Sequence, residues 1–262
     1  GVHPDIPAFS DHVDGFHDFV YNRAEMYDDG DHGTACISIM NRVVPDARYI
    51  VYKIHDEDGY NALTDVLEAF NQVIVDHPDV LNNSWGLSEV REIEGMTWVD
   101  ANRVLNETLQ RVDAAGILIS TSAGNGSYDG TFTDEQLPEG SRYTISTGAT
   151  TIMGEIAGFS DLDAHVFAPG HLVYVTRSAA NNDFWSGTSF SGPFTTAAVA
   201  VIENYGNTLG RELTRDEVVS ILQESGSPQS STIIGHDGQA RRFEFRALDY
   251  QRLVQHLQEN YR

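Results

Sequence analysis

Short apolar segments that alternate with longer amphipathic segments constrain the fold of this chain more than any other feature. Residues 48–54 (RYIVYKI) have the β-branched and aromatic content of a buried strand. Residues 61–76 follow, with apolar side chains at helical spacing. Strands separated by helices of this kind predict an α/β fold, in which a mainly parallel sheet is covered by helices on both faces. The same patterns predict further strands at 80–84, 117–121, 143–148 and 173–177, and further helices at 97–115, 189–205, 214–225 and 249–259.

The ends of the chain are less regular. Residues 1–33 are rich in Asp, His and Gly and are predicted to be loop, with one short strand near 16–20. Residues 35–40 are expected to begin a buried helix. No internal repeat or linker divides the sequence, so residues 1–262 are predicted to form a single domain.

The charge balance restricts the partners of the protein. Sixteen basic and 39 acidic residues give a net charge of −23, which argues against nucleic acid as a partner. Lys53 is the single lysine. Two explanations of this acidity stay open: a protein kept soluble in salt, and an ordinary acidic secreted protein. Cys36 is the single cysteine, so an intrachain disulfide is excluded. No apolar run approaches the roughly 20 residues of a membrane span.

The segment Ser186-Gly-Thr-Ser-Phe-Ser-Gly-Pro193 precedes a helix rich in Ala and Val. A serine at a helix N-terminus can act as a nucleophile, because the helix dipole and its own N–H stabilise a developing oxyanion. Pro193 is expected in the first turn of that helix, where no N–H is required. Taken alone, the segment is better explained as an ordinary Ser/Thr N-cap.

Two further segments carry suitable chemistry. In Asp31-His32-Gly33-Thr34, a histidine at a helix start could serve as a general base. In Ser122-Ala123-Gly124-Asn125, an asparagine that follows a buried strand could donate to an oxyanion. Each is weak alone, since the chain has ten histidines and Gly-Asn is common in turns.

Taken together, the three segments resemble the motifs of the subtilisin-like serine peptidases (subtilases), in which Asp, His and Ser occur in that chain order. The resemblance extends over residues 1 to about 225. It implies a three-layer sandwich around a mainly parallel sheet, a secreted or cell-envelope endopeptidase and a polypeptide substrate, and it leaves an N-terminal propeptide open. It also implies His32 as general base, Ser189 rather than Ser191 as nucleophile, and Asn125 as oxyanion donor. The substrate-binding residues implied by the resemblance are Ser84, Trp85 and Gly86, which would pair with extended peptide, together with Ala123 and Gly124.

The sequence departs from the family pattern at its start. The family's catalytic aspartate lies on a central strand shortly before a His-Pro-Asp segment, and here His3-Pro-Asp5 begins two residues after Gly1. We therefore expect the aspartate and its strand to precede residue 1, and no carboxylate among Asp28, Asp29 and Asp31 to replace it convincingly. A chain that is part of a longer protein and a catalytically impaired pseudoprotease are both compatible with this pattern. No cofactor and no metal site are expected, because the segment 40–44 is too short for the calcium loop of many family members.

Two functions from other classes remain as alternatives. A peptide-binding or scaffold protein on the same fold would keep affinity for extended peptides without hydrolysing them. An esterase of the α/β-hydrolase type is disfavoured, because no Gly-x-Ser-x-Gly surrounds Ser189 and the histidine precedes the serine. Substrate preference and oligomeric state cannot be derived from these motifs.

Overall fold

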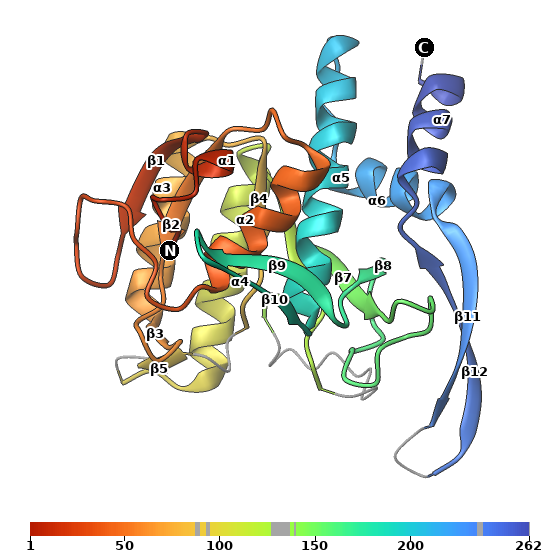
Figure 1. The fold of residues 1–262 in the computed structure, drawn as a ribbon, viewed down its shortest axis with the longest axis horizontal. Coiled ribbons are helices and arrows are strands. Elements are labelled where there is room, and N and C mark those ends of the chain that lie inside the picture. The colour runs from red at the N-terminus through yellow and green to blue at the C-terminus, as the bar shows by residue number, and fades with distance from the viewer. Residues whose placement is uncertain (87–89, 93–94, 127–136, 139, 235–237, 262) are drawn as a thin grey trace.

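A six-stranded sheet forms the centre of the computed structural model, which describes residues 1–86, 90–92, 95–126, 137–138, 140–234 and 238–261 (Figure 1). The order of its strands is β11-β12-β8-β7-β6-β4. All neighbours are parallel except β11 and β12, which form an antiparallel hairpin. The strands are β4 (Val80–Asn83), β6 (Leu118–Ser122), β7 (Ile145–Thr150), β8 (Val166–Pro169), β11 (Ser227–Ile234) and β12 (Ala240–Ala247).

Three smaller sheets surround this one. In the first, β1 and β2 run parallel and pair only with each other in the described part of the chain. The antiparallel pair β9–β10 packs against α2, and β3 pairs with β5. These strands are β1 (Val13–Asp18), β2 (Tyr49–Lys53), β3 (Asn61–Ala62), β5 (Val90–Glu92), β9 (Val173–Ser178) and β10 (Asn181–Trp185).

Helices cover both faces of the central sheet, and the core side chains show which face each helix covers. Ile119 of β6 packs among residues of α3 (Leu63–Asp76) and α4 (Trp98–Ala114). Leu118, its neighbour, points to the opposite face, as alternation along a strand requires. That face is covered by α5 (Thr188–Thr208), α6 (Arg215–Ser225) and α7 (Tyr250–Asn260), with α2 (His32–Val43) beside α5. A short α1 (Pro7–Ser10) precedes β1.

The structure confirms the α/β class and the mainly parallel sheet. The predicted capping box of α6 is present, since Thr214 and Glu217 bond reciprocally. Seven elements were not predicted, namely α1, β3, β5, β8, β10 and the two strands of the β11–β12 hairpin. Most positions of β11 and β12 are exposed, so the hairpin lacks the apolar signal of a buried strand. In the described residues no helix is both long enough and apolar enough to span a membrane.

The predicted position of Pro193 is wrong. Pro193 lies inside α5, which begins at Thr188, rather than in its first turn. Because proline has no N–H, the carbonyl group four residues earlier, that of Ser189, loses its helical hydrogen bond. The Ser189 carbonyl oxygen is therefore available to side chains outside α5.

Candidate active site

His32 is the first residue of α2, as predicted, and its side chain is exposed. The carboxylate of Asp28 fixes this helix start from the preceding loop, since it accepts from the N–H of Thr34 at 3.0 Å and also from its hydroxyl. Gly33 lies so close to Gly1 that an added Cβ would come 2.1 Å from the Gly1 carbonyl oxygen. The imidazole is therefore attached to a rigid helix terminus.

Ser189 lies in the first turn of α5 and is half-buried. Its carbonyl oxygen, freed by Pro193, accepts from Ser84 Oγ at 3.0 Å and from Cys36 Sγ at 3.6 Å. The hydroxyl of Ser189 in turn donates to the carbonyl oxygen of Ser84 at 3.2 Å. The first turn of α5 is thus attached both to the end of β4 and to α2.

Cys36 connects the two residues predicted as base and nucleophile. Its Sγ lies 3.9 Å from Nδ1 of His32, one helical turn earlier, while it also contacts the carbonyl of Ser189. Phe190, which follows Ser189, places its ring centroid 5.5 Å from that of His32. Burial raises the pKa of the Cys36 thiol to about 12, so the thiol stays protonated at neutral pH. The structure therefore brings His32 and Ser189, which are far apart in sequence, to one locality.

Ser191 is placed differently from Ser189. It is fully buried, and its hydroxyl donates to the carbonyl of Thr188 at 2.9 Å within the same helix. A buried hydroxyl that bonds its own helix is not available for attack on a peptide. This contrast favours Ser189.

Asn125 follows β6 and approaches the first turn of α5. Its Oδ1 accepts from the N–H of Thr188 at 2.9 Å and from the Thr188 hydroxyl at 3.1 Å. The Thr188 hydroxyl also accepts from the N–H of Gly124 at 3.2 Å. With Oδ1 engaged by two donors, Nδ2 is the group with which the exposed Asn125 side chain can donate to a bound substrate.

The residues predicted to bind substrate lie around this point. Ser84 and Gly86 follow β4, and Ser84 is buried against Ser189. The indole of Trp85 is buried in the core, and its Nε1 donates to Asn83 Oδ1 at 2.9 Å. Ala123 is buried and bonded to β7, and Gly124 has a φ of +100°, a conformation that favours glycine.

Cys36 and Thr188 belong to the site but were not predicted from the sequence. The spacing of Cys36 from His32 could have indicated it, because residues four apart lie on the same face of a helix. Thr188 gave no comparable signal, since its role depends on a loop 63 residues away.

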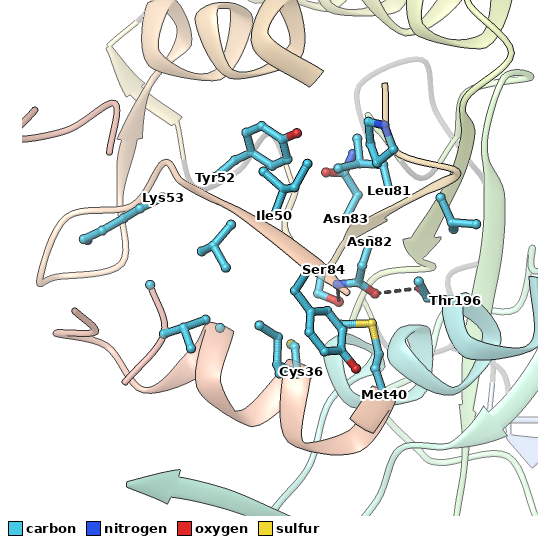
Figure 2. A pocket seen from close by; sticks show the side chains of 18 of the residues that line it. Cys36, Met40, Ile50, Tyr52, Lys53, Leu81, Asn82, Asn83, Ser84 and Thr196 are labelled. Atoms are coloured by element: carbon cyan, nitrogen blue, oxygen red, sulfur yellow. Dashed lines mark hydrogen bonds between the residues drawn. The ribbon is translucent and has the colours of Figure 1, made fainter. Parts of the chain in front are cut away.

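A slot of about 1190 Å³ adjoins the site, between β2 and β4. In the described residues β2 pairs only with β1, and β4 pairs only with β6, so the edges that line the slot have no partner strand. Figure 2 shows Ile50 and Tyr52 of β2 on one side, Asn82 and Ser84 at β4 on the other, and Cys36 of α2 pointing into the space. His32, Gly1 and Val2 also line it.

Polar groups at the wall of the slot have no partner. Nδ2 of Asn83 and the hydroxyl of Tyr49 are buried, and no described residue hydrogen-bonds them. Buried polar atoms are rarely left in this state. The edges of β2 and β4 thus line the same slot, and neither pairs with another described strand across it.

Comparison with known proteins decides the family. A model of the subtilase family matches residues 2–237. The chain belongs to the subtilase family. It is therefore a member of a family of serine peptidases with a subtilisin-like α/β fold.

Individual subtilases agree with this assignment. Bacillopeptidase F of Bacillus subtilis (strain 168) is 29% identical over 87% of this chain and 17% of its own length. Subtilisin NAT of Bacillus subtilis subsp. natto is 26% identical over 86% of this chain and 58% of its own length. The chain thus spans little more than half the length of subtilisin NAT and less than a fifth of the length of bacillopeptidase F.

Two solved structures share the fold. A lanthipeptide protease has a TM-score of 0.79 at 21% identity, with 97% of this chain and 85% of that chain covered. A cold adapted subtilisin-like serine proteinase has a TM-score of 0.72 at 20% identity, with 92% and 84% covered. The sheet and helices described above are therefore those of a subtilase.

Proposed function

We propose that this chain is the catalytic part of a serine endopeptidase in which Ser189 attacks a peptide carbonyl. His32 accepts the proton of the Ser189 hydroxyl as the Oγ–C bond forms, and then passes it to the amine that leaves. Water attacks the resulting acyl-enzyme in a second step and regenerates the serine. The observation that supports this most directly is the contact of Cys36 with both residues, since it places their helix termini together.

In the same proposal Asn125 and the N–H of Ser189 stabilise the oxyanion. The two hydrogen bonds from Thr188 hold the carboxamide oxygen of Asn125, and this leaves the amide N–H₂ as the donor. A donor fixed in this way before the reaction loses little free energy to reorganisation when the negative charge develops.

The triad also requires a carboxylate, and the three acidic residues just before His32 are engaged elsewhere. Asp28 bonds Thr34, Asp29 pairs with Lys53 at 2.8 Å, and Asp31 contacts His3 at 2.9 Å. We propose that the carboxylate comes from an aspartate on a strand preceding Gly1, and that this strand fills the slot between β2 and β4.

Three features support a strand in the slot. Both facing edges belong to parallel sheets, so one extended segment can pair with each of them. The walls are mainly apolar, and His32 is one of the residues that line the slot. Gly1 itself lines the slot, so a segment joined to it can enter without crossing another element.

Substrate and location follow from the same proposal. Extended peptide would add as a strand against Ser84–Gly86, next to Ser189. We propose a secreted or cell-envelope protein that is made with an N-terminal propeptide.

A fluorophosphonate probe tests the proposal, because it reacts with an activated serine hydroxyl. The protein with its upstream segment should be labelled at Ser189, Ser189→Ala should abolish labelling, and Ser191→Ala should retain it. Absence of labelling in the longer protein would reject the peptidase.

One observation keeps a non-catalytic peptide binder as the second candidate. The Ser189 hydroxyl donates to a backbone carbonyl, that of Ser84, and must turn away from it before it can react. If the protein is a binder, it should bind extended peptides, but it should neither cleave them nor react with the fluorophosphonate probe.

A further inference from the structure

The start of α2 is attached to β9 by an ion pair that no part of the proposed triad uses. Nε and Nη2 of Arg177, in β9, donate to Oδ2 of Asp31 at 3.1 and 2.8 Å. Oδ1 of the same carboxylate lies 2.9 Å from Nε2 of His3. Both carboxylate oxygens of the residue immediately before His32 are therefore held.

Asp31 has an uncommon backbone conformation for this position. Its φ is +59°, in the left-handed region, and its side chain makes no capping hydrogen bond to α2. An aspartate before a helix ordinarily caps the N–H groups of the first turn. Here Asp28 supplies that cap to Thr34 from the loop. The carboxylate of Asp31 is thereby released to bind Arg177.

Arg177 is also connected, through Trp185, to Phe190, the residue next to Ser189. Its guanidinium carbon lies 5.0 Å from the ring centroid of Trp185, in β10. The Trp185 ring packs edge-on against Phe190 at 5.5 Å, and Phe190 is 5.5 Å from His32. Phe190 directly follows Ser189. The contacts therefore close a ring that runs from His32 through Asp31, Arg177, Trp185 and Phe190 back to His32.

We propose that Arg177 is a positioning residue, which sets the separation of His32 from Ser189 by binding Asp31 and Trp185 at once. This inference rests on the proposed function, since it concerns the same pair of residues. The ion pair is suited to the role because two N–H groups of one guanidinium converge on Oδ2 of Asp31, which fixes the orientation of the guanidinium as well as its distance. The guanidinium is planar, so it can stack on Trp185 while its edge binds the carboxylate.

The kinetic test uses the protein with its upstream segment, three single variants, Arg177→Met, Arg177→Lys and Asp31→Asn, and one double variant. Arg177→Met should lower kcat on a peptide substrate, and the rate of fluorophosphonate labelling, by about 10- to 100-fold with KM unchanged, because small displacements of reacting groups cost rate rather than binding. Arg177→Lys keeps the positive charge but lacks the planar guanidinium with its two N–H donors. Its kcat should therefore lie between those of Arg177→Met and the wild type. The double variant Asp31→Asn/Arg177→Met should be no slower than the worse single variant, since the residues act as one unit.

Arg48→Met is the matched control. Arg48 also pairs with an aspartate, Asp14, but both side chains are half exposed or more and lie outside the ring. Its kcat and KM should equal those of the wild type. The proposal is overturned if Arg177→Met is as fast as Arg48→Met, if the loss appears in KM alone, or if the effects of the two single variants add.

A spectroscopic measurement separates this inference from the proposed function. The imidazole proton resonances of His32, assigned by their absence in His32→Gln, should shift in Arg177→Met and stay unchanged in Arg48→Met. This holds even for a protein that hydrolyses nothing. Failure of the wild type to label would reject the peptidase, whereas unchanged His32 resonances in a folded Arg177→Met protein would reject the positioning role.

Discussion

Ser84 and Ser189 each donate a hydrogen bond to the carbonyl oxygen of the other, although 105 residues separate them. The pair exists because Pro193 has no N–H with which to occupy the Ser189 carbonyl. A proline inside a helix thus creates the acceptor that holds the helix start against β4.

Ser84→Ala tests this pair. The variant removes the donor to Ser189 and leaves a buried carbonyl less well satisfied, so we expect about 1 kcal/mol lower stability. Labelling of Ser189 should slow several-fold as the first turn of α5 loosens. Ser220→Ala, at an exposed helix position with an i,i+4 contact to Glu224, is the control. It should change neither the stability nor the labelling rate. Equal melting temperatures and labelling rates in the two variants would contradict the prediction.

Cys36→Ala should leave the chemistry largely intact. The thiol contacts His32 and Ser189, but burial holds its pKa near 12 and therefore keeps it neutral. We expect about 1 kcal/mol lower stability from lost packing and little change in the labelling rate. Iodoacetamide at pH 7 should modify the unfolded protein and leave the native protein unmodified. Complete loss of labelling in Cys36→Ala would show that the thiol takes part in the reaction.

Asn125→Asp separates the structural role of this side chain from its role as a donor. The aspartate can still accept both hydrogen bonds from Thr188, so the melting temperature should change little. It cannot donate to an oxyanion, so kcat should fall by about 10²- to 10³-fold with KM nearly constant. Steady-state kinetics on a peptide substrate provide the measurement, and a variant with wild-type kcat would remove Asn125 from the mechanism.

His165 should make stability depend on pH. Burial, together with the nearby Arg215 guanidinium, lowers the pKa of this histidine from 6.5 to about 4. Between pH 4 and 6.5 the unfolded chain then binds more protons than the folded one, so stability is full above pH 6.5 and decreases as the pH falls toward 4. The loss is on the order of 3 kcal/mol at most, at about 1.4 kcal/mol for each pKa unit.

Urea unfolding of the wild type and His165→Gln across this range measures the effect. The variant should be less stable at pH 7, where it lacks the bond from the N–H of Ser146 to Nδ1, but its stability should change less with pH. Parallel pH profiles for the two proteins would mean that another group controls acid stability.

Amide hydrogen exchange tests the strand proposed for the slot. In the protein that carries residues before Gly1, the backbone N–H groups of β2 and β4 that face the slot should exchange at the slow rate of the sheet interior. In residues 1–262 alone the same groups should exchange faster, while those of β7 stay protected in both. Equal exchange at β2 and β4 in the two proteins would contradict a strand in the slot.

Much of the architecture could be predicted from local patterns. The apolar spacing of 61–76 and 97–115 predicted α3 and α4, and the capping box at Thr214 placed the start of α6. The β11–β12 hairpin could not be predicted, because most of its residues are exposed and carry no periodic apolar signal. Its existence depends on contacts such as that of Phe245 with Phe167, 4.9 Å between ring centroids, which no local pattern reports.

For the site, the sequence by itself determined which side chains are available and that His32 and Ser189 begin helices. It could not determine how those helix termini meet, because that depends on long-range packing around Cys36 and Phe190. Only the tertiary structure decided that Asp28 caps α2, that Asp31 is free to bind Arg177, and that a slot separates β2 from β4. The physical reason is that hydrogen bonds and burial are satisfied between separate segments of the chain. The partners lie from six residues away, as for Asp28 and Thr34, to 146 residues away, as for Asp31 and Arg177.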